Sequence, residues 1–261
     1  MDCVSPAGDA VLAYCADLRW HRVNIAYRSA LEMRAGAPAV VSSSLEPDEP
    51  PVVDAPRICW RSAALGIRAH WTETRPAPKR DALALRLYDS PEGSIDWACL
   101  SPAAEVRVET RHGTYAGYGY VEHVRMTIAP WRLPISSLRW GRIATRDDAI
   151  VWIQWRGGFE TTIVHANGDR LAASQLDDAR VALADETTIQ LDRRQVLRSG
   201  ALRSTVLPSI PVLRDLAPFR LLSMRERKWL SRAVITGPRR VPTETWAIHE
   251  LVTFPKRAHG S

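Results

Sequence analysis

The sequence predicts an all-β protein made of antiparallel strands, and three observations support this fold class. Apolar and polar residues alternate in many segments; in 81–89, for example, Leu83, Leu85 and Leu87 fall on one face. Turn-forming residues separate these segments, as at 88–93. Clear helical periodicity is scarce, and strands do not alternate with helices. Many short strands joined by polar turns indicate a sandwich or a barrel rather than a parallel sheet.

The expected strands follow this alternation along the chain. They lie at 11–20, 63–73, 81–89, 93–100, 104–111, 115–128, 149–157, 187–193, 228–237 and 244–254. The pair Asn167-Gly168 stands between two apolar halves and predicts a two-residue hairpin. We expect short helices only at 29–34, 171–180 and 212–223.

Two irregular segments organise the chain. The segment 37–56 is rich in proline and serine and predicts a surface loop or an excursion at a sheet edge. The segment 129–137 contains two prolines and interrupts the strand pattern near the midpoint. We therefore predict an N-terminal β domain at 1–130 and a C-terminal β-barrel domain at 131–261, each of a size that suits a small barrel.

Composition excludes several classes of protein. No apolar run approaches the roughly 20 residues that cross a bilayer, so no transmembrane segment is predicted. The N-terminus lacks the pattern of a secretory signal, and we expect a cytoplasmic protein. The four cysteines are widely spaced and predict free thiols rather than a zinc site. The net charge is +6, but the arginines are scattered, so we expect no nucleic-acid partner. The oligomeric state is left open.

The segment Gly-Tyr-Gly-Tyr-Val-Glu-His at 117–123 is the main candidate for chemistry. In a strand over 115–128, Glu122 shares a face with Tyr118 and Tyr120, while His123 falls on the opposite face. A carboxyl group shut away from water among aromatic rings resists ionisation and exchanges a proton near neutral pH. The alternative is a carboxylate paired with one of the many arginines, with His123 a structural histidine. The glycines indicate close approach of a ligand or another backbone.

Tryptophans and a second acid follow this segment. Trp140, Trp152 and Trp155 are either core residues or the walls of a hydrophobic pocket. Near the C-terminus, Trp246, Ile248 and Glu250 share one face and His249 lies on the other. Glu250 is either a second interior carboxylate or the partner of a cation. The residues predicted to bind substrate are Tyr118, Tyr120, Trp140, Arg142, Trp152 and Glu250.

Motifs for other chemistries are missing from the sequence. It contains no phosphate-binding glycine loop, no nucleophile elbow and no zinc-protease motif. His112, His123 and His165 are too far apart in sequence to indicate a metal site. We therefore predict neither a cofactor nor a metal.

Three segments resemble the carotenoid 1,2-hydratase (hydroxyneurosporene synthase) family and its lipocalin-like relatives, which include cofactor-independent cyclases. They are 117–123, 130–143 and 150–158, with weaker similarity at 58–71, 97–106 and 246–252. The resemblance implies two lipocalin-like β units around a hydrophobic pocket, and an activity that hydrates, isomerises or cyclises apolar polyenes by acid-base chemistry.

The resemblance also implies roles for individual residues. Glu122 stands where the family has an aspartate, and His123 keeps the place of the family's histidine. Val121 replaces a second expected histidine, and Val124-Arg125-Met126 replaces an expected Asn-Trp-Gly. These departures favour a proton transfer other than water addition to a carotenoid.

The sequence therefore predicts a cofactor-independent hydratase, isomerase or cyclase for a hydrophobic, isoprenoid or polyketide-like molecule. Glu122 would be the general acid or base, with His123 tuning or relaying the proton, and aromatic rings would stabilise a developing carbocation. The alternative is a non-catalytic carrier of a hydrophobic ligand in the same barrel. A basic protein that binds RNA or DNA is a third hypothesis.

Overall fold

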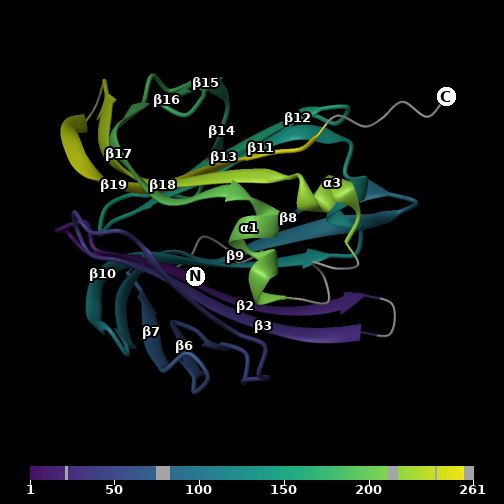
Figure 1. Ribbon diagram of the computed structural model, residues 1–261. Helices are drawn as coiled ribbons and strands as arrows, with labels where there is room; N and C mark the ends of the chain where they lie inside the picture. Colours follow the sequence, from purple (N-terminus) through teal and green to yellow (C-terminus); the bar gives the residue numbers. More distant parts are fainter. Residues whose placement is uncertain (21–22, 75–82, 211–216, 239, 256–261) are drawn as a thin grey trace. The chain divides into compact units, whose positions relative to one another are not determined.

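A computed structural model describes residues 1–20, 23–74, 83–210, 217–238 and 240–255 (Figure 1). The predicted all-β class is confirmed, because the described residues form two antiparallel sheets with only short helices. None of the helices in these ranges is long and apolar enough to span a membrane.

The first sheet is built from the N-terminal half of the chain. Its strands are β1 (Asp2–Val4), β2 (Ala10–Trp20), β3 (Val23–Met33), β4 (Val40–Ser44), β5 (Val52–Asp54), β6 (Arg57–Ser62), β7 (Ile67–Glu73), β8 (Ala84–Ser90), β9 (Gly93–Thr110) and β10 (Gly113–Met126). Their order in the sheet is β4-β3-β2-β1-β10-β9-β7-β6-β5, and β8 pairs with β9 off this path. The two edge strands, β4 and β5, are consecutive in the chain, so the sheet curls back toward its own edge.

The second sheet is built from the C-terminal half. Its strands are β11 (Ile135–Ala144), β12 (Ala149–Gly157), β13 (Thr161–Ala166), β14 (Asp169–Leu171), β15 (Ala173–Leu176), β16 (Arg180–Leu183), β17 (Thr188–Ala201), β18 (Arg225–Gly237) and β19 (Arg240–Thr253). Their order is β14-β13-β12-β11-β19-β18-β17-β16-β15. Only Ala172 separates the two edge strands in the chain, so the sheet closes almost into a barrel. The short helices are η2 (Pro130–Arg132), α1 (Leu202–Thr205), η3 (Leu207–Ser209) and α3 (Phe219–Leu222).

The chain forms two compact units. Unit 1 comprises Met1–Leu85, Trp97–Val124 and Ile143–Ala149, and unit 2 comprises Arg86–Asp96, Arg125–Arg142 and Ile150–Ser261. The expected junction at 129–137 contains η2 and the start of β11, which lead from the last strand of the first sheet to the first strand of the second.

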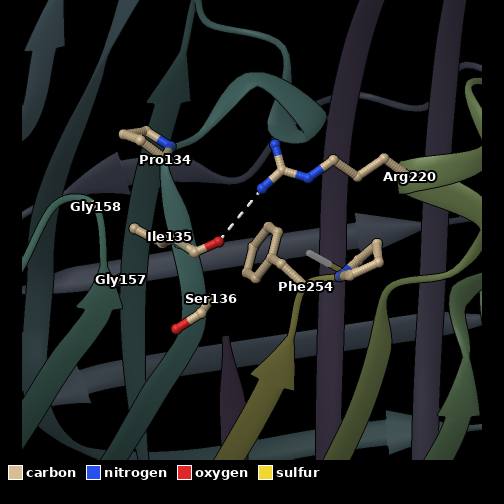
Figure 2. Close-up of a pocket in the computed structure, with 8 residues that line it drawn as sticks. Pro134, Ile135, Ser136, Gly157, Gly158, Arg220 and Phe254 are labelled. Carbon is tan, nitrogen blue, oxygen red and sulfur yellow. Dashed lines mark hydrogen bonds between the residues drawn. The ribbon is translucent and has the colours of Figure 1, made fainter. Parts of the chain in front are cut away.

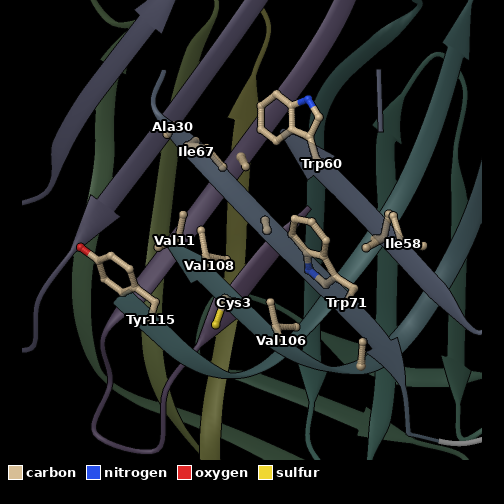
Figure 3. Close-up of a cluster of buried hydrophobic side chains, with 14 of the residues drawn as sticks. Cys3, Val11, Ala30, Ile58, Trp60, Ile67, Trp71, Val106, Val108 and Tyr115 are labelled. Carbon is tan, nitrogen blue, oxygen red and sulfur yellow. The ribbon is translucent and has the colours of Figure 1, made fainter. Parts of the chain in front are cut away.

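A hydrophobic cluster fills the interior of unit 1 (Figure 3). Trp60 on β6 and Trp71 on β7 lie in it together with aliphatic side chains such as Val106 and Val108 on β9. Val121 on β10 belongs to the same cluster. Because side chains alternate along a strand, Tyr120 and Glu122 lie on the other face of β10.

Most of the expected strands are present. The segments 93–100 and 104–111 are parts of one continuous strand, β9, and 149–157 coincides with β12. Residues 63–66 form a turn ahead of β7, and 81–82 lie outside the described residues. The hairpin at Asn167-Gly168 is confirmed: both residues have positive φ, 53° and 97°, and Ala166 pairs with Asp169. The segment 37–56 is an edge excursion that carries β4 and β5.

The helix predictions are mostly wrong. Residues 29–33 form the end of β3, because β3 is paired with β2 on one side and β4 on the other, and Arg34 follows the strand. The segment 171–180 holds the end of β14, all of β15 and the start of β16. In 212–223, only α3 is helical among the described residues, and 212–216 lie outside them.

Candidate functional site

The Glu122 carboxylate on β10 is held by two buried aromatic side chains of unit 1. The indole Nε1–H of Trp97 on β9 donates to Glu122 Oε2 at 2.8 Å, and the Tyr120 hydroxyl donates to the same oxygen at 2.8 Å. Trp97 and Tyr120 are each only 1% exposed, whereas Glu122 is half-buried. Both donors are neutral, so the carboxylate is positioned without a counter-charge from them.

The glycines of this segment are explained by a neighbouring backbone. β1 runs against β10, with Val4 opposite Tyr118. A Cβ atom on Gly117 would lie 2.0 Å from the Val4 carbonyl oxygen, and one on Gly119 would lie 2.0 Å from the Asp2 carbonyl oxygen. The Asp2 carboxylate also accepts the Tyr120 backbone N–H at 3.1 Å. These contacts fix the strand segment that carries Glu122.

Glu122 makes no ion pair with any residue in the described part of the chain. A buried thiol, Cys99 on β9, is its near neighbour. Burial raises the pKa of Cys99 well above its ordinary value, and the negative charge of Glu122 raises it further. Cys99 therefore stays a protonated thiol at neutral pH.

His123 is exposed and lies on the face of β10 opposite Glu122, as the alternation predicts. Within the described ranges no hydrogen bond joins the two side chains. Tyr118 is half-buried on the Glu122 face. Unit 1 thus brings together Glu122 and Tyr120 and adds Trp97, while the joint action of Glu122 and His123 stays a prediction.

The other predicted residues, Trp140, Arg142, Trp152 and Glu250, belong to unit 2. Strand register aligns Arg198 on β17, Lys228 on β18, Glu250 on β19 and Trp140 on β11 in one row across four neighbouring strands. Lys228 forms an ion pair with Glu250. Glu250 is therefore the partner of a cation, which was the alternative that the sequence left open.

Nearby cations lower the pKa of Glu250 by more than burial raises it. Burial raises the pKa of Glu250, but Lys228, Arg142 and Arg198 lower it, and the net direction is downward. Glu226, beside this row on β18, forms an ion pair with Arg198. Glu250 is thus held ionised in a buried charge network and is poorly suited to donate a proton.

The opposite face of the same strands carries a buried histidine. His249 lies 2.8 Å (Nε2) from the Ser231 hydroxyl, and its ring stacks on Trp229 with centroids 4.9 Å apart. Burial lowers the pKa of His249 to about 4. Beside it, Gly141 leaves room for the Trp152 indole, since a Cβ there would lie 2.2 Å from that ring. Trp152 is therefore a core residue that packs against Gly141. His249, with its lowered pKa, is neutral at neutral pH.

A pocket of about 250 Å³ opens at the end of β11 and β12 in unit 2 (Figure 2). Its wall contains Arg220, whose Nη2 donates to the carbonyl oxygens of Leu133 at 3.0 Å and Ile135 at 3.3 Å. The lining residues are Pro134, Ile135, Ser136, Gly157, Gly158, Arg220, Phe254 and Pro255. None of the residues predicted from the sequence lines this pocket.

The sequence pattern missed Trp97 and Arg220. Trp97 had a usable signal, because alternation in 93–100 places it on one face with Ile95 and Cys99. Its bond to Glu122 depends on how β9 and β10 pair, which alternation does not specify. No comparable sequence pattern marked Arg220 as a residue that lines a pocket. Among the described residues, no group of three or more His, Cys, Asp or Glu side chains is arranged to hold a metal ion.

No protein-family model and no curated protein sequence matches the chain. Among solved structures, the chain is similar to the crystal structure of a "putative AttH" from Nitrosomonas europaea, with a TM-score of 0.52 and 10% identity. The match covers 94% of this chain and 86% of that chain. At this identity the likeness establishes the architecture alone. The resemblance to the hydratase family and its lipocalin-like relatives stays a prediction.

Proposed function

We propose that the protein is a cofactor-independent hydratase, isomerase or cyclase that moves protons on a hydrophobic, isoprenoid or polyketide-like small molecule. The observation that carries this proposal is the Glu122 carboxylate held by Trp97 and Tyr120, two neutral donors, at 2.8 Å each. A carboxyl group fixed by neutral donors keeps its orientation, and it carries no built-in cation that would hold it permanently ionised.

The chemistry follows from where the donors lie. Trp97 and Tyr120 both bind Oε2, so Oε1 is the oxygen that would exchange a proton with the substrate. Transfer of that proton to a carbon–carbon double bond leaves a carbocation, which the faces of nearby aromatic rings stabilise. Water addition, loss of a neighbouring proton or attack by a second double bond then gives hydration, isomerisation or cyclisation.

A non-catalytic carrier is the second candidate function, and the pocket in unit 2 favours it. The lining side chains of Pro134, Ile135, Phe254 and Pro255 are apolar, and none of the eight lining residues is an acid or a histidine. Such a pocket binds an apolar molecule without an obvious group to transform it.

The test is incubation of the protein with acyclic isoprenoid alcohols and polyenes in heavy water, followed by mass spectrometry. Enzyme action adds water or places deuterium at the newly protonated carbon. Glu122→Gln should lower this rate about 10²-fold or more and leave ligand binding intact. Glu105→Gln, which alters an exposed carboxylate on β9, is the matched control and should keep full activity. Binding without any deuterium uptake by the wild-type protein would favour the carrier.

A further inference from the structure

A second carboxylate in unit 1 orients an exposed imidazole at the turn between β9 and β10. Glu32 on β3 is only 5% exposed. The Thr110 hydroxyl donates to Glu32 Oε2 at 2.6 Å, and His112 Nδ1 lies 3.0 Å from Glu32 Oε1. The His112 side chain itself is 52% exposed. A buried acceptor thus holds one edge of a ring whose other edge reaches the surface.

This contact fixes the tautomer of His112. An ionised carboxylate only accepts hydrogen bonds, so the nitrogen that faces Glu32 must carry the proton. In the neutral imidazole, Nε2 then holds the lone pair. The arrangement in which a carboxylate orients a histidine through Nδ1–H is the one that makes Nε2 an effective base or nucleophile in acyl-transfer enzymes.

Neighbouring groups keep the turn in place. Burial and the negative charge of Glu32 together raise the pKa of Tyr115 to about 12, although the Arg34 guanidinium lowers it, so Tyr115 stays a neutral phenol. The Arg34 guanidinium lies 3.8 Å from the centroid of the Tyr115 ring and bonds the Thr114 carbonyl at 3.3 Å. Gly113 has φ of 132°, and a Cβ there would lie 2.6 Å from Arg34 Nη2.

Two other exposed histidines in unit 1 lack this support. His70 Nδ1 faces the Cys59 thiol at 3.3 Å, and neither His70 nor His123 contacts a carboxylate within the described ranges. His112 is therefore distinguished by its buried orienting group rather than by exposure alone.

We propose that His112 is a nucleophilic site separate from Glu122, which accepts acyl groups from small activated esters and passes them to water. Nε2 attacks the carbonyl carbon, the bond to the leaving alcohol oxygen breaks, and the alkoxide or phenolate departs. Nδ1–H remains hydrogen-bonded to Glu32, which offsets the positive charge of the acylated ring. Water then adds to the acyl carbon, the carbon–nitrogen bond breaks, and the carboxylic acid is released. The second proton of the water stays on the ring and then passes to the departed alkoxide or phenolate, which restores the neutral imidazole. Glu32 is the positioning residue.

The first experiment measures hydrolysis of p-nitrophenyl acetate by the full chain. His112→Gln should lower the second-order rate constant about tenfold or more. His70→Gln is the matched control and should leave it near the wild-type value. An unchanged rate in His112→Gln, or an equal loss in both variants, would overturn the proposal.

A second experiment separates positioning from folding. Diethyl pyrocarbonate acylates accessible imidazoles, and mass spectrometry reports each histidine separately. Glu32→Gln should slow labelling of His112 while His123 reacts as in the wild type. If Glu32 serves only the fold, the substitution lowers the stability of the protein but does not slow the labelling of His112. That result would also contradict the proposal.

Discussion

At the scale of the residue, the two acids that the sequence singled out have opposite surroundings. Glu122 is held by neutral donors, whereas Glu250 lies in a row with Lys228 and Arg198. Alternation along one strand places aromatic residues on the same face as each of the two acids. The difference comes from neighbouring strands, whose register no local pattern specifies. Alternation placed Tyr120 on the face of Glu122, whereas the Trp97 donor and the Lys228 partner of Glu250 depend on strand pairing and could not be predicted.

The buried histidine of unit 2 predicts that acid destabilises the protein. Burial lowers the pKa of His249 from 6.5 to about 4, so below pH 6.5 the unfolded chain takes up a proton that the folded chain refuses. The free energy of unfolding should fall by about 3 kcal/mol between pH 6.5 and pH 4 from this group, and no further below that range. Urea denaturation at a series of pH values measures this loss.

The matched variants for this prediction are His249→Gln and His123→Gln. The first removes the titrating group, so stability should become less dependent on pH in this range even though the Ser231 contact is disturbed. The second alters an exposed imidazole and should leave the pH dependence intact. Identical pH slopes in all three proteins would show that His249 does not titrate as stated.

At the scale of the element, strands with one buried face were predictable and strands that depend on pairing were not. The alternation in 63–73 and 93–100 located β7 and the first part of β9, whose burial alternates in the structure. Residues 29–34, with Ala30, Leu31, Glu32 and Met33, have high helix propensity, but pairing on both sides keeps them in β3. Tertiary pairing overrides propensity here. The short strands β15 and β16 were missed because they are too brief to establish a period.

The close approach of β1 to β10 predicts that Gly119→Ala is destabilising. The added methyl group would lie 2.0 Å from the Asp2 carbonyl oxygen and 2.8 Å from Val106 Cγ2. Either β1 must shift or β10 must bend, and the cost should be about 3 kcal/mol. Chemical denaturation measures it. Ala116→Val enlarges an exposed position on the same strand and should change stability by less than about 0.5 kcal/mol. Equal stability of the two variants would contradict the contact.

At the scale of the whole molecule, the chain devotes each half to one antiparallel sheet whose edge strands are consecutive in sequence. The fold class and the likeness to the Nitrosomonas europaea structure agree on this architecture. The sequence predicted the all-β class with antiparallel strands because alternation and turn residues repeat throughout the chain, but it did not predict the strand order within each sheet. The pocket of unit 2 was beyond prediction, since it joins the ends of β11 and β12 to α3 and to residues after β19.

This strand order predicts that backbone amides exchange their hydrogens more slowly at the centre of each sheet than at its edges. Amides of β1, β10, β11 and β19 lie between paired neighbours at the centre of each sheet and should exchange slowest. Amides of β4, β5, β14 and β15 lie at the edges and should exchange fastest among the strands. Exchange followed by mass spectrometry measures both groups. Edge strands as protected as central ones would contradict the strand order.

The four strands at the ends of the two strand orders are also brief. β5 and β14 have three residues each, β15 has four and β4 has five, against eighteen in β9. An incoming chain that added itself to such a border would gain only a few ladder hydrogen bonds, too little to offset the entropy of ordering it. Short strands at these edges therefore disfavour the edge-to-edge pairing by which a protein made almost wholly of strands would aggregate.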